Sequence, residues 1–96
     1  SSDLHLVGAD LASASTITPT SAIHRVTGTT TIVNISVPDV FNDGENTGGH
    51  ITIIPTEIFS WTTAGNIGLA GTSVVGKAIT FTYIPGIHKW YPSTVS

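Results

Sequence analysis

The segment Gly76-Lys77-Ala78-Ile79-Thr80-Phe81-Thr82-Tyr83 decides the fold of this chain, because apolar and polar residues alternate along it. Strict alternation predicts a β-strand with one face turned to a core and the other to solvent. We expect this strand to span residues 77–84. Pro85-Gly86 follows as a turn signal, and residues 87–91 then predict the partner strand. The last third of the chain therefore predicts a β-hairpin.

Short runs rich in Thr, Ile and Val precede this hairpin, and most of them end at Gly or Pro. Because β-branched side chains fit a pleated sheet better than a helix, each run predicts a strand. Residues 8–14 are the only stretch that suggests a helical turn, and we interpret them as a loop or a single turn. The expected strands cover residues 16–18, 23–27, 30–37, 50–54, 58–62 and 67–70.

Seven or eight short strands predict an all-β domain with a β-sandwich, jelly-roll-like or small-barrel architecture. Its strands are also candidates for interleaving in a trimer. A short β-helix is an alternative, which the absence of a clean internal repeat disfavours. Within residues 30–37, strict alternation places Ile32 and Ile35 on opposite faces of the strand. We expect residues 1–20 to form an N-terminal arm and residues 21–96 a single β domain.

The composition favours a self-associating domain without nucleic acid or membrane partners. Only 9% of the 96 residues are charged, 40% are hydrophobic, and there is no cysteine. A small β domain without disulfides gains stability by burying surface against other subunits, so a homo-oligomer is expected. The chain has three basic residues and a net charge of −3. Three positive side chains are too few to neutralise a nucleic-acid backbone or to bind a surface of anionic lipids. No apolar run reaches the length of a membrane span, and no signal peptide is recognisable.

No set of residues predicts catalysis, a metal or a cofactor. Oxygen ligands cluster in the loop before residue 49, but their spacing differs from that of a calcium-binding hand, so we favour a solvated acidic turn. The four histidines are too far apart in sequence to form a zinc set in one protomer. Nucleophile elbows, paired catalytic carboxylates and phosphate loops are absent, so we expect no enzyme. The residues considered were Asp39, Asp43, Glu45, Asn46, His5, His24, His50 and His88.

The tryptophans allow two interpretations. Alternation places Phe59 and Trp61 on one face of their strand, and Trp90 and Tyr91 on opposite faces of theirs. A partly exposed Trp is a platform on which a sugar ring stacks, and nearby polar side chains supply hydrogen bonds. In a domain of this size a Trp is more often part of the core or of a subunit interface. The glycosylation signal at Asn34 lies inside a predicted strand and carries little weight.

Six stretches of strand and turn follow one another along most of the chain: Ala9 to Pro19, Ile23 to Gly28, Gly49 to Pro55, Phe59 to Ile67, Gly76 to Tyr83 and Lys89 to Pro92. They resemble small β-modules on virion surface proteins of tailed bacteriophages, which serve as capsid decoration proteins or as distal parts of fibres and appendages. Such modules tend to carry Asp-Gly-Thr before the final Lys-Trp-Tyr, where this chain has a different turn.

The resemblance implies a non-enzymatic protein on the virion surface. It favours a trimeric capsid decoration (cement) protein that stabilises the phage head and contacts the major capsid protein or another virion protein. Leu4, Leu6, Val7 and Leu11 of the arm are then the candidate capsid or subunit contacts.

The alternative is a fibre or appendage domain that binds a host receptor or glycan. Its candidate contacts are Trp61, Asn42, Asp43 and His88. A secreted carbohydrate-binding module of cellular origin is a more distant third hypothesis.

Overall fold

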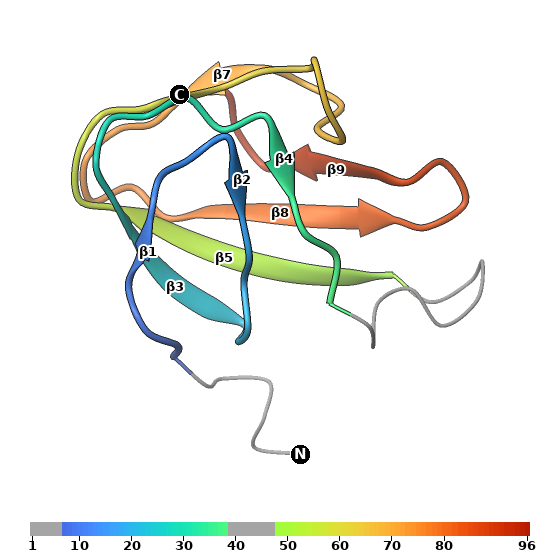
Figure 1. The fold of residues 1–96 in the computed structure, drawn as a ribbon, viewed down its shortest axis with the longest axis horizontal. Coiled ribbons are helices and arrows are strands. Elements are labelled where there is room, and N and C mark those ends of the chain that lie inside the picture. Colours follow the sequence, from blue (N-terminus) through green and yellow to red (C-terminus); the bar gives the residue numbers. More distant parts are fainter. Residues whose placement is uncertain (1–6, 39–47) are drawn as a thin grey trace.

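The computed structural model describes residues 7–38 and 48–96, and strands are the only regular elements among these residues. The expected all-β fold is therefore confirmed. Five strands form the main sheet (Figure 1), and their order across it is β1 (Leu11–Ala12), β3 (Ile23–Thr27), β5 (Gly49–Pro55), β8 (Ile79–Ile84) and β9 (Lys89–Pro92).

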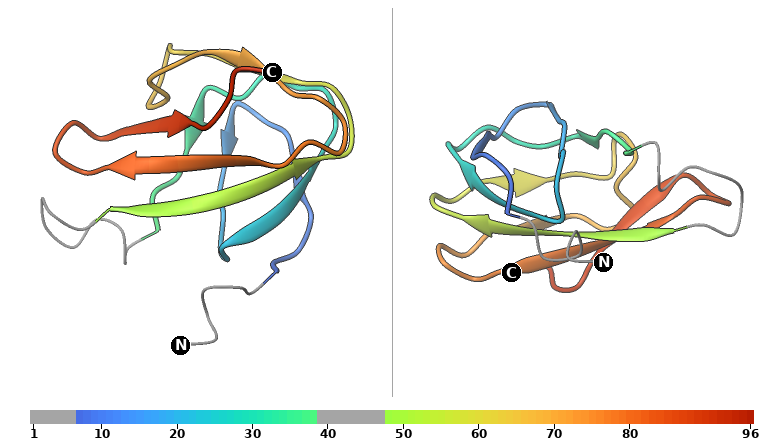
Figure 2. Two further views of the ribbon diagram at one scale, coloured as in Figure 1. Left: turned by 180° about the vertical axis from the view of Figure 1, so that it is seen from behind. Right: turned by 90° about the horizontal axis from the view of Figure 1, so that it is seen from below.

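Four shorter strands lie on one side of the main sheet and make a second layer (Figure 2). They pair as two small sheets, in which β2 (Thr16–Ile17) joins β4 (Asn34–Ile35) and β6 (Ser60–Trp61) joins β7 (Gly71–Thr72). A bridge between Ile32 and Trp61 links the two pairs. The core lies between this layer and the main sheet.

The first two thirds of the described chain wind back and forth between the two layers. β1, β3 and β5 are parallel neighbours in the main sheet, while β2 and β4 are parallel neighbours in the second layer. The bridge between Ile32 and Trp61 is parallel as well. Each strand of one layer therefore pairs in parallel with the next strand of that layer along the chain, as in a short coil, although the sequence shows no repeat.

The last third forms the expected hairpin. β5, β8 and β9 are antiparallel neighbours, and the side chains of Ile79, Phe81 and Tyr83 are buried as alternation requires. β8 begins two residues later than expected. The reason is a turn in which the Lys77 N–H donates to the Val74 carbonyl, with Gly76 at a φ of 80°.

The main sheet is open. β1 and β9 are its two edges and do not pair with each other, so the described strands do not form the small barrel that the sequence allowed. Neighbouring strands of a jelly roll are antiparallel. Here antiparallel pairing in the main sheet is limited to β5, β8 and β9, because the preceding strands stack in parallel.

The predicted strand over residues 30–37 is shorter than expected, and its alternation is wrong. Only β4 is regular, and both Ile32 and Ile35 are buried on the core side. The N–H groups of Val33 and Asn34 both donate to the Ser15 carbonyl, at 2.9 and 2.8 Å. Two donors on one acceptor are typical of a bulge, which shifts the side-chain register by one residue.

Two other segments also differ from expectation. Residues 8–14 contain a strand, β1, because Leu11 and Ala12 pair with Val26 and Thr27 far along the chain. Residues 67–70 contain only a bridge from Ile67 to Trp90. The Leu69 carbonyl accepts the indole N–H of Trp61 instead of a strand partner.

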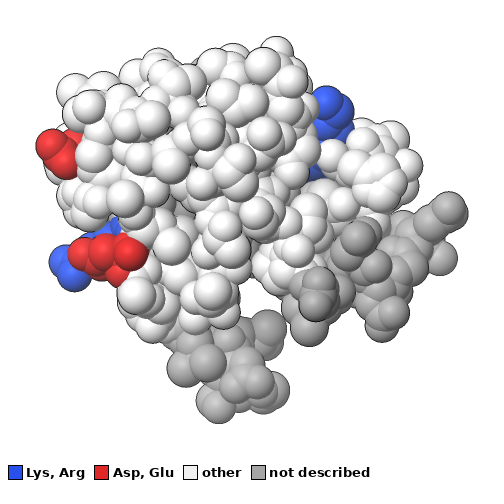
Figure 3. Space-filling view, in the orientation of Figure 1, with Lys and Arg blue, Asp and Glu red and all other residues white. Residues whose placement is uncertain are grey.

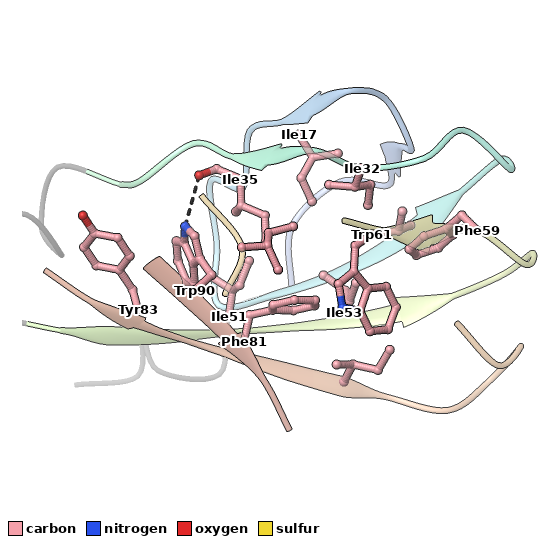
Figure 4. Close-up of a cluster of buried hydrophobic side chains, with 13 residues drawn as sticks. Ile17, Ile32, Ile35, Ile51, Ile53, Phe59, Trp61, Phe81, Tyr83 and Trp90 are labelled. Carbon is pink, nitrogen blue, oxygen red and sulfur yellow. Dashed lines mark hydrogen bonds between the residues drawn. The ribbon is translucent and has the colours of Figure 1, made fainter. Parts of the chain in front are cut away.

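Aromatic rings fill the centre of the core (Figure 4). Trp61 and Phe81 meet edge to face with ring centroids 5.5 Å apart, and Tyr83 and Trp90 lie 5.0 Å apart. Such pairs stabilise a core by about 0.5–1.5 kcal/mol each beyond the area that they bury. Among residues 7–38 and 48–96, the buried hydrophobic residues are Ile17, Val26, Ile32, Ile35, Ile51, Ile53, Phe59, Trp61, Ile67, Ile79, Phe81, Tyr83 and Trp90.

Candidate functional site

Several predicted site residues fall outside the described ranges. These are Leu4 and Leu6 of the arm and Asn42 and Asp43 of the polar loop, together with the other acidic-loop residues and His5. Val7 is described and exposed, and it bridges to Ile23. Leu11 is partly buried and packs against the core. Residues 7–17 thus pair with and pack on residues of the same chain.

Trp61 does not offer a ring to a ligand. Its side chain is 1% exposed, and that of Trp90 is 0% exposed. The Trp61 indole N–H donates to the Leu69 carbonyl at 3.0 Å, and the Trp90 indole N–H donates to the Ile35 carbonyl at 3.1 Å (Figure 4). The sugar platform proposed for Trp61 is therefore wrong, because both rings fill the space between the two layers.

His88 lies in the turn between β8 and β9 and is exposed. Its φ of 54° is in the left-handed region, where it is the only residue other than glycine in the described ranges. The ring nitrogen Nδ1 lies 3.2 Å from the hydroxyl of Tyr83. That contact ties the turn to the end of the core.

His24 is a structural residue. Its side chain is fully buried, and Nε2 accepts the N–H groups of Thr20 and Ser21, both at 3.0 Å. Nδ1 lies 2.7 Å from the Ala9 carbonyl oxygen, to which it donates in this arrangement. One ring therefore joins the segment before β1, the turn before β3, and β3 itself.

The described residues contain no group of three or more His, Cys, Asp or Glu side chains that could hold a metal ion. Asn34 of the glycosylation signal is partly buried, and its Oδ1 accepts the N–H of Asn66 at 3.1 Å. Every buried side-chain nitrogen and oxygen within residues 7–38 and 48–96 has a hydrogen-bond partner. These polar groups hold the fold together.

Charges are few and peripheral. In the face shown in Figure 3, charged side chains lie near the margins and the centre is neutral. Arg25 pairs with Asp10 at 3.0 Å, and Glu57 accepts the Gly28 N–H at 2.7 Å. Lys89 donates to the Gly65 carbonyl at 3.1 Å, and Lys77 donates to the Ser96 carbonyl. Each charged residue in the described ranges thus has a partner within the chain.

The side of the main sheet away from the core carries an ordered set of polar groups. His50 of β5 pairs with Thr82 of β8, and Thr82 pairs with Tyr91 of β9, so the three residues form one line across the sheet. We call His50, Thr82 and Tyr91 the outer row. His50 Nδ1 lies 3.1 Å from Thr82 Oγ1. Since Ile51, Tyr83 and Trp90 point into the core, the outer row points away from it.

A second line of hydroxyl groups runs beside the outer row. Thr52 and Thr80 are cross-strand partners whose hydroxyl oxygens lie 3.1 Å apart. Ser93 continues this line, because its Oγ accepts the Thr80 N–H at 3.1 Å. The Tyr91 ring packs over Gly68, where any side chain would collide with it, and Tyr91 is 40% exposed.

Exposed apolar side chains are the other surface feature. Ile58, Val74 and Val75 are 61%, 45% and 56% exposed, and we call them the 58/74/75 patch. The chain segments that carry them are joined, because Ser73 donates its N–H to the Phe59 carbonyl and accepts the Phe59 N–H on its hydroxyl. The remaining large exposed apolar residues within the described ranges are Val7, Leu69, Ile84, Ile87, Tyr91 and Val95.

Comparison of the chain with protein-family models, with curated proteins and with solved structures found no match. None of the described segments is a helix long and apolar enough to cross a membrane.

Proposed function

We propose that the chain is a non-enzymatic structural module of a virion surface, and that it assembles through its exposed apolar side chains. The 58/74/75 patch is the observation that carries the proposal, because three large aliphatic side chains on joined segments stand largely in solvent. Contiguous apolar surface marks contact with another protein, and the hydrogen bonds between Ser73 and Phe59 bring the segment of Ile58 beside that of Val74 and Val75. The scarcity of charge agrees with a surface that packs closely against neighbours.

Within this proposal the chain is a trimeric capsid decoration protein that contacts the major capsid protein and stabilises the phage head. In this proposal the two layers act as a β-sandwich, and the buried cluster of the described residues supports this interpretation. The resemblance to phage surface modules supports this assignment. The buried polar side chains of the described ranges all have hydrogen-bond partners, which supports a structural role rather than a catalytic one.

The test compares phage particles that carry the chain with particles from which it has been removed. We expect the depleted particles to release their genome at a lower temperature. Added wild-type chain restores the release temperature, whereas Val75→Asp does not, because a carboxylate in a buried apolar contact is costly. Thr63→Asp, at an exposed residue outside the patch, is the matched control and restores it. Equal release temperatures with and without the chain would contradict the stabilising role.

A fibre or appendage domain that binds a glycan is the second candidate function. The outer row favours it, because an exposed aromatic ring stands there beside hydroxyl and imidazole groups.

A further inference from the structure

We propose that the outer row binds a neutral saccharide, with the sugar ring stacked on Tyr91 and its hydroxyl groups bonded by Thr82 and His50. This inference concerns the outer face of the sheet and does not depend on the assembly role proposed for the 58/74/75 patch.

The position of the Tyr91 ring supports stacking. Tyr91 is 40% exposed, so much of its side chain can be covered by a ligand. The same ring packs over Gly68, whose N–H donates to the Trp90 carbonyl at 2.7 Å. A ring supported by fixed backbone loses little conformational entropy when a ligand covers it.

The hydrogen-bonding groups beside Tyr91 fit sugar hydroxyls. The contact between His50 Nδ1 and Thr82 Oγ1 restrains both side chains and leaves His50 Nε2 to bond a ligand. A hydroxyl has one donor and two acceptor positions, so Thr82 retains capacity for a sugar hydroxyl. The neighbouring pair of Thr52 and Thr80 extends the polar surface along the strands.

The spacing fits a short saccharide. Neighbouring strands lie about 4.8 Å apart, so the line from His50 across Thr82 to Tyr91 spans about 10 Å. Two linked pyranose rings cover a similar length. Strand pairing fixes the three positions before any ligand arrives.

The charge of this surface favours a neutral sugar. Neither the outer row nor the Thr52 and Thr80 pair contains Asp, Glu, Lys or Arg. Two cations lie on this sheet, and both have partners: Arg25 of β3 is paired with Asp10, and Lys89, two residues before Tyr91 on β9, donates to the Gly65 carbonyl at 3.1 Å. An acidic sugar would find no free cation among these groups, and such a ligand would lose its hydration without compensation.

The experiment has two stages. The chain is first applied to an array of neutral and acidic glycans, and the strongest neutral binder is then titrated into isotope-labelled chain and followed by NMR. We expect neutral glycans to be retained and the largest amide shifts to fall on residues 50, 82 and 91. Tyr91→Ala should weaken binding about tenfold or more, while Tyr91→Phe should stay within about threefold of the wild type.

Thr82→Val is a second variant, because it removes the hydroxyl and keeps the shape of the side chain. It should weaken binding with an unchanged melting temperature, whereas Thr63→Val, outside the face, should leave binding unchanged. Binding to no glycan, binding to acidic glycans alone, or shifts centred elsewhere would overturn the proposal. So would a dimer that Tyr91→Ala dissociates, because a second copy would then cover the face. The heat stability of particles is measured separately, so failure here leaves the structural role unaffected.

Discussion

His24 shows at the scale of single residues how a polar side chain is used in this core. Alternation in residues 23–27 predicts that His24 shares the face of Val26, and both side chains are fully buried. Its two ring nitrogens then need partners, which come from Ala9, Thr20 and Ser21. Those partners were not predictable, because the segment before β1 reaches His24 only in the folded chain.

We expect His24→Ala to lower the free energy of unfolding by about 3 kcal/mol, because two backbone N–H groups and one carbonyl lose a partner and a cavity remains. Urea unfolding measures the change. His50→Ala, on the opposite side of the sheet, is the matched control and should cost about 0.5 kcal/mol. Equal losses for the two variants would show that His24 does not tie the segments together.

At the scale of elements, the Asn66 side chain joins β4 to the segment beside β9. Its Oδ1 accepts the Ile35 N–H at 2.8 Å, and its Nδ2 donates to the Ile35 carbonyl at 2.7 Å. The Asn66 carbonyl accepts the Trp90 N–H at 2.8 Å. A side-chain amide thus pairs with Ile35 as a neighbouring strand would, which connects the second layer to the main sheet.

Asn66→Ala should destabilise the protein by about 2 kcal/mol, because it leaves the buried Ile35 N–H without a partner. Hydrogen exchange at the Ile35 amide should accelerate with it. Thr63→Ala in the same loop is exposed and should change neither quantity. Continued protection of the Ile35 amide in Asn66→Ala would contradict this account of how the layers are joined.

Elements with strong local signals were predictable, and those that depend on distant partners were not. The strand over residues 23–27 matches its predicted bounds, and the strand predicted at residues 50–54 extends by one residue at each end. β1 was missed, because its two residues become a strand only through pairing with β3. The bulge at Val33 was not predictable, because it depends on the Ser15 carbonyl, a distant group that accepts the N–H groups of both Val33 and Asn34.

The same limit applies to the candidate site. Alternation predicts that Tyr91 faces away from Trp90, and it also places His50 opposite Ile51. Whether His50 and Tyr91 lie in one line depends on the register of β5, β8 and β9. The structure gives that register, because Thr82 pairs with both residues. Trp61 was a candidate ligand contact because alternation alone does not show which face of its strand is covered. In the structure its ring is buried against Phe81 of the main sheet, which agrees with the core position that a Trp in a domain of this size more often takes.

At the scale of the whole molecule, a sparsely charged surface with exposed aliphatic side chains covers a core whose buried polar side chains have hydrogen-bond partners in the described ranges. The central claim is that this surface assembles. Multi-angle light scattering of the purified chain tests it most directly. We predict a mass of about 30 kDa, three times the 9.9 kDa of one chain. A mass of 9.9 kDa at every concentration would contradict the claim.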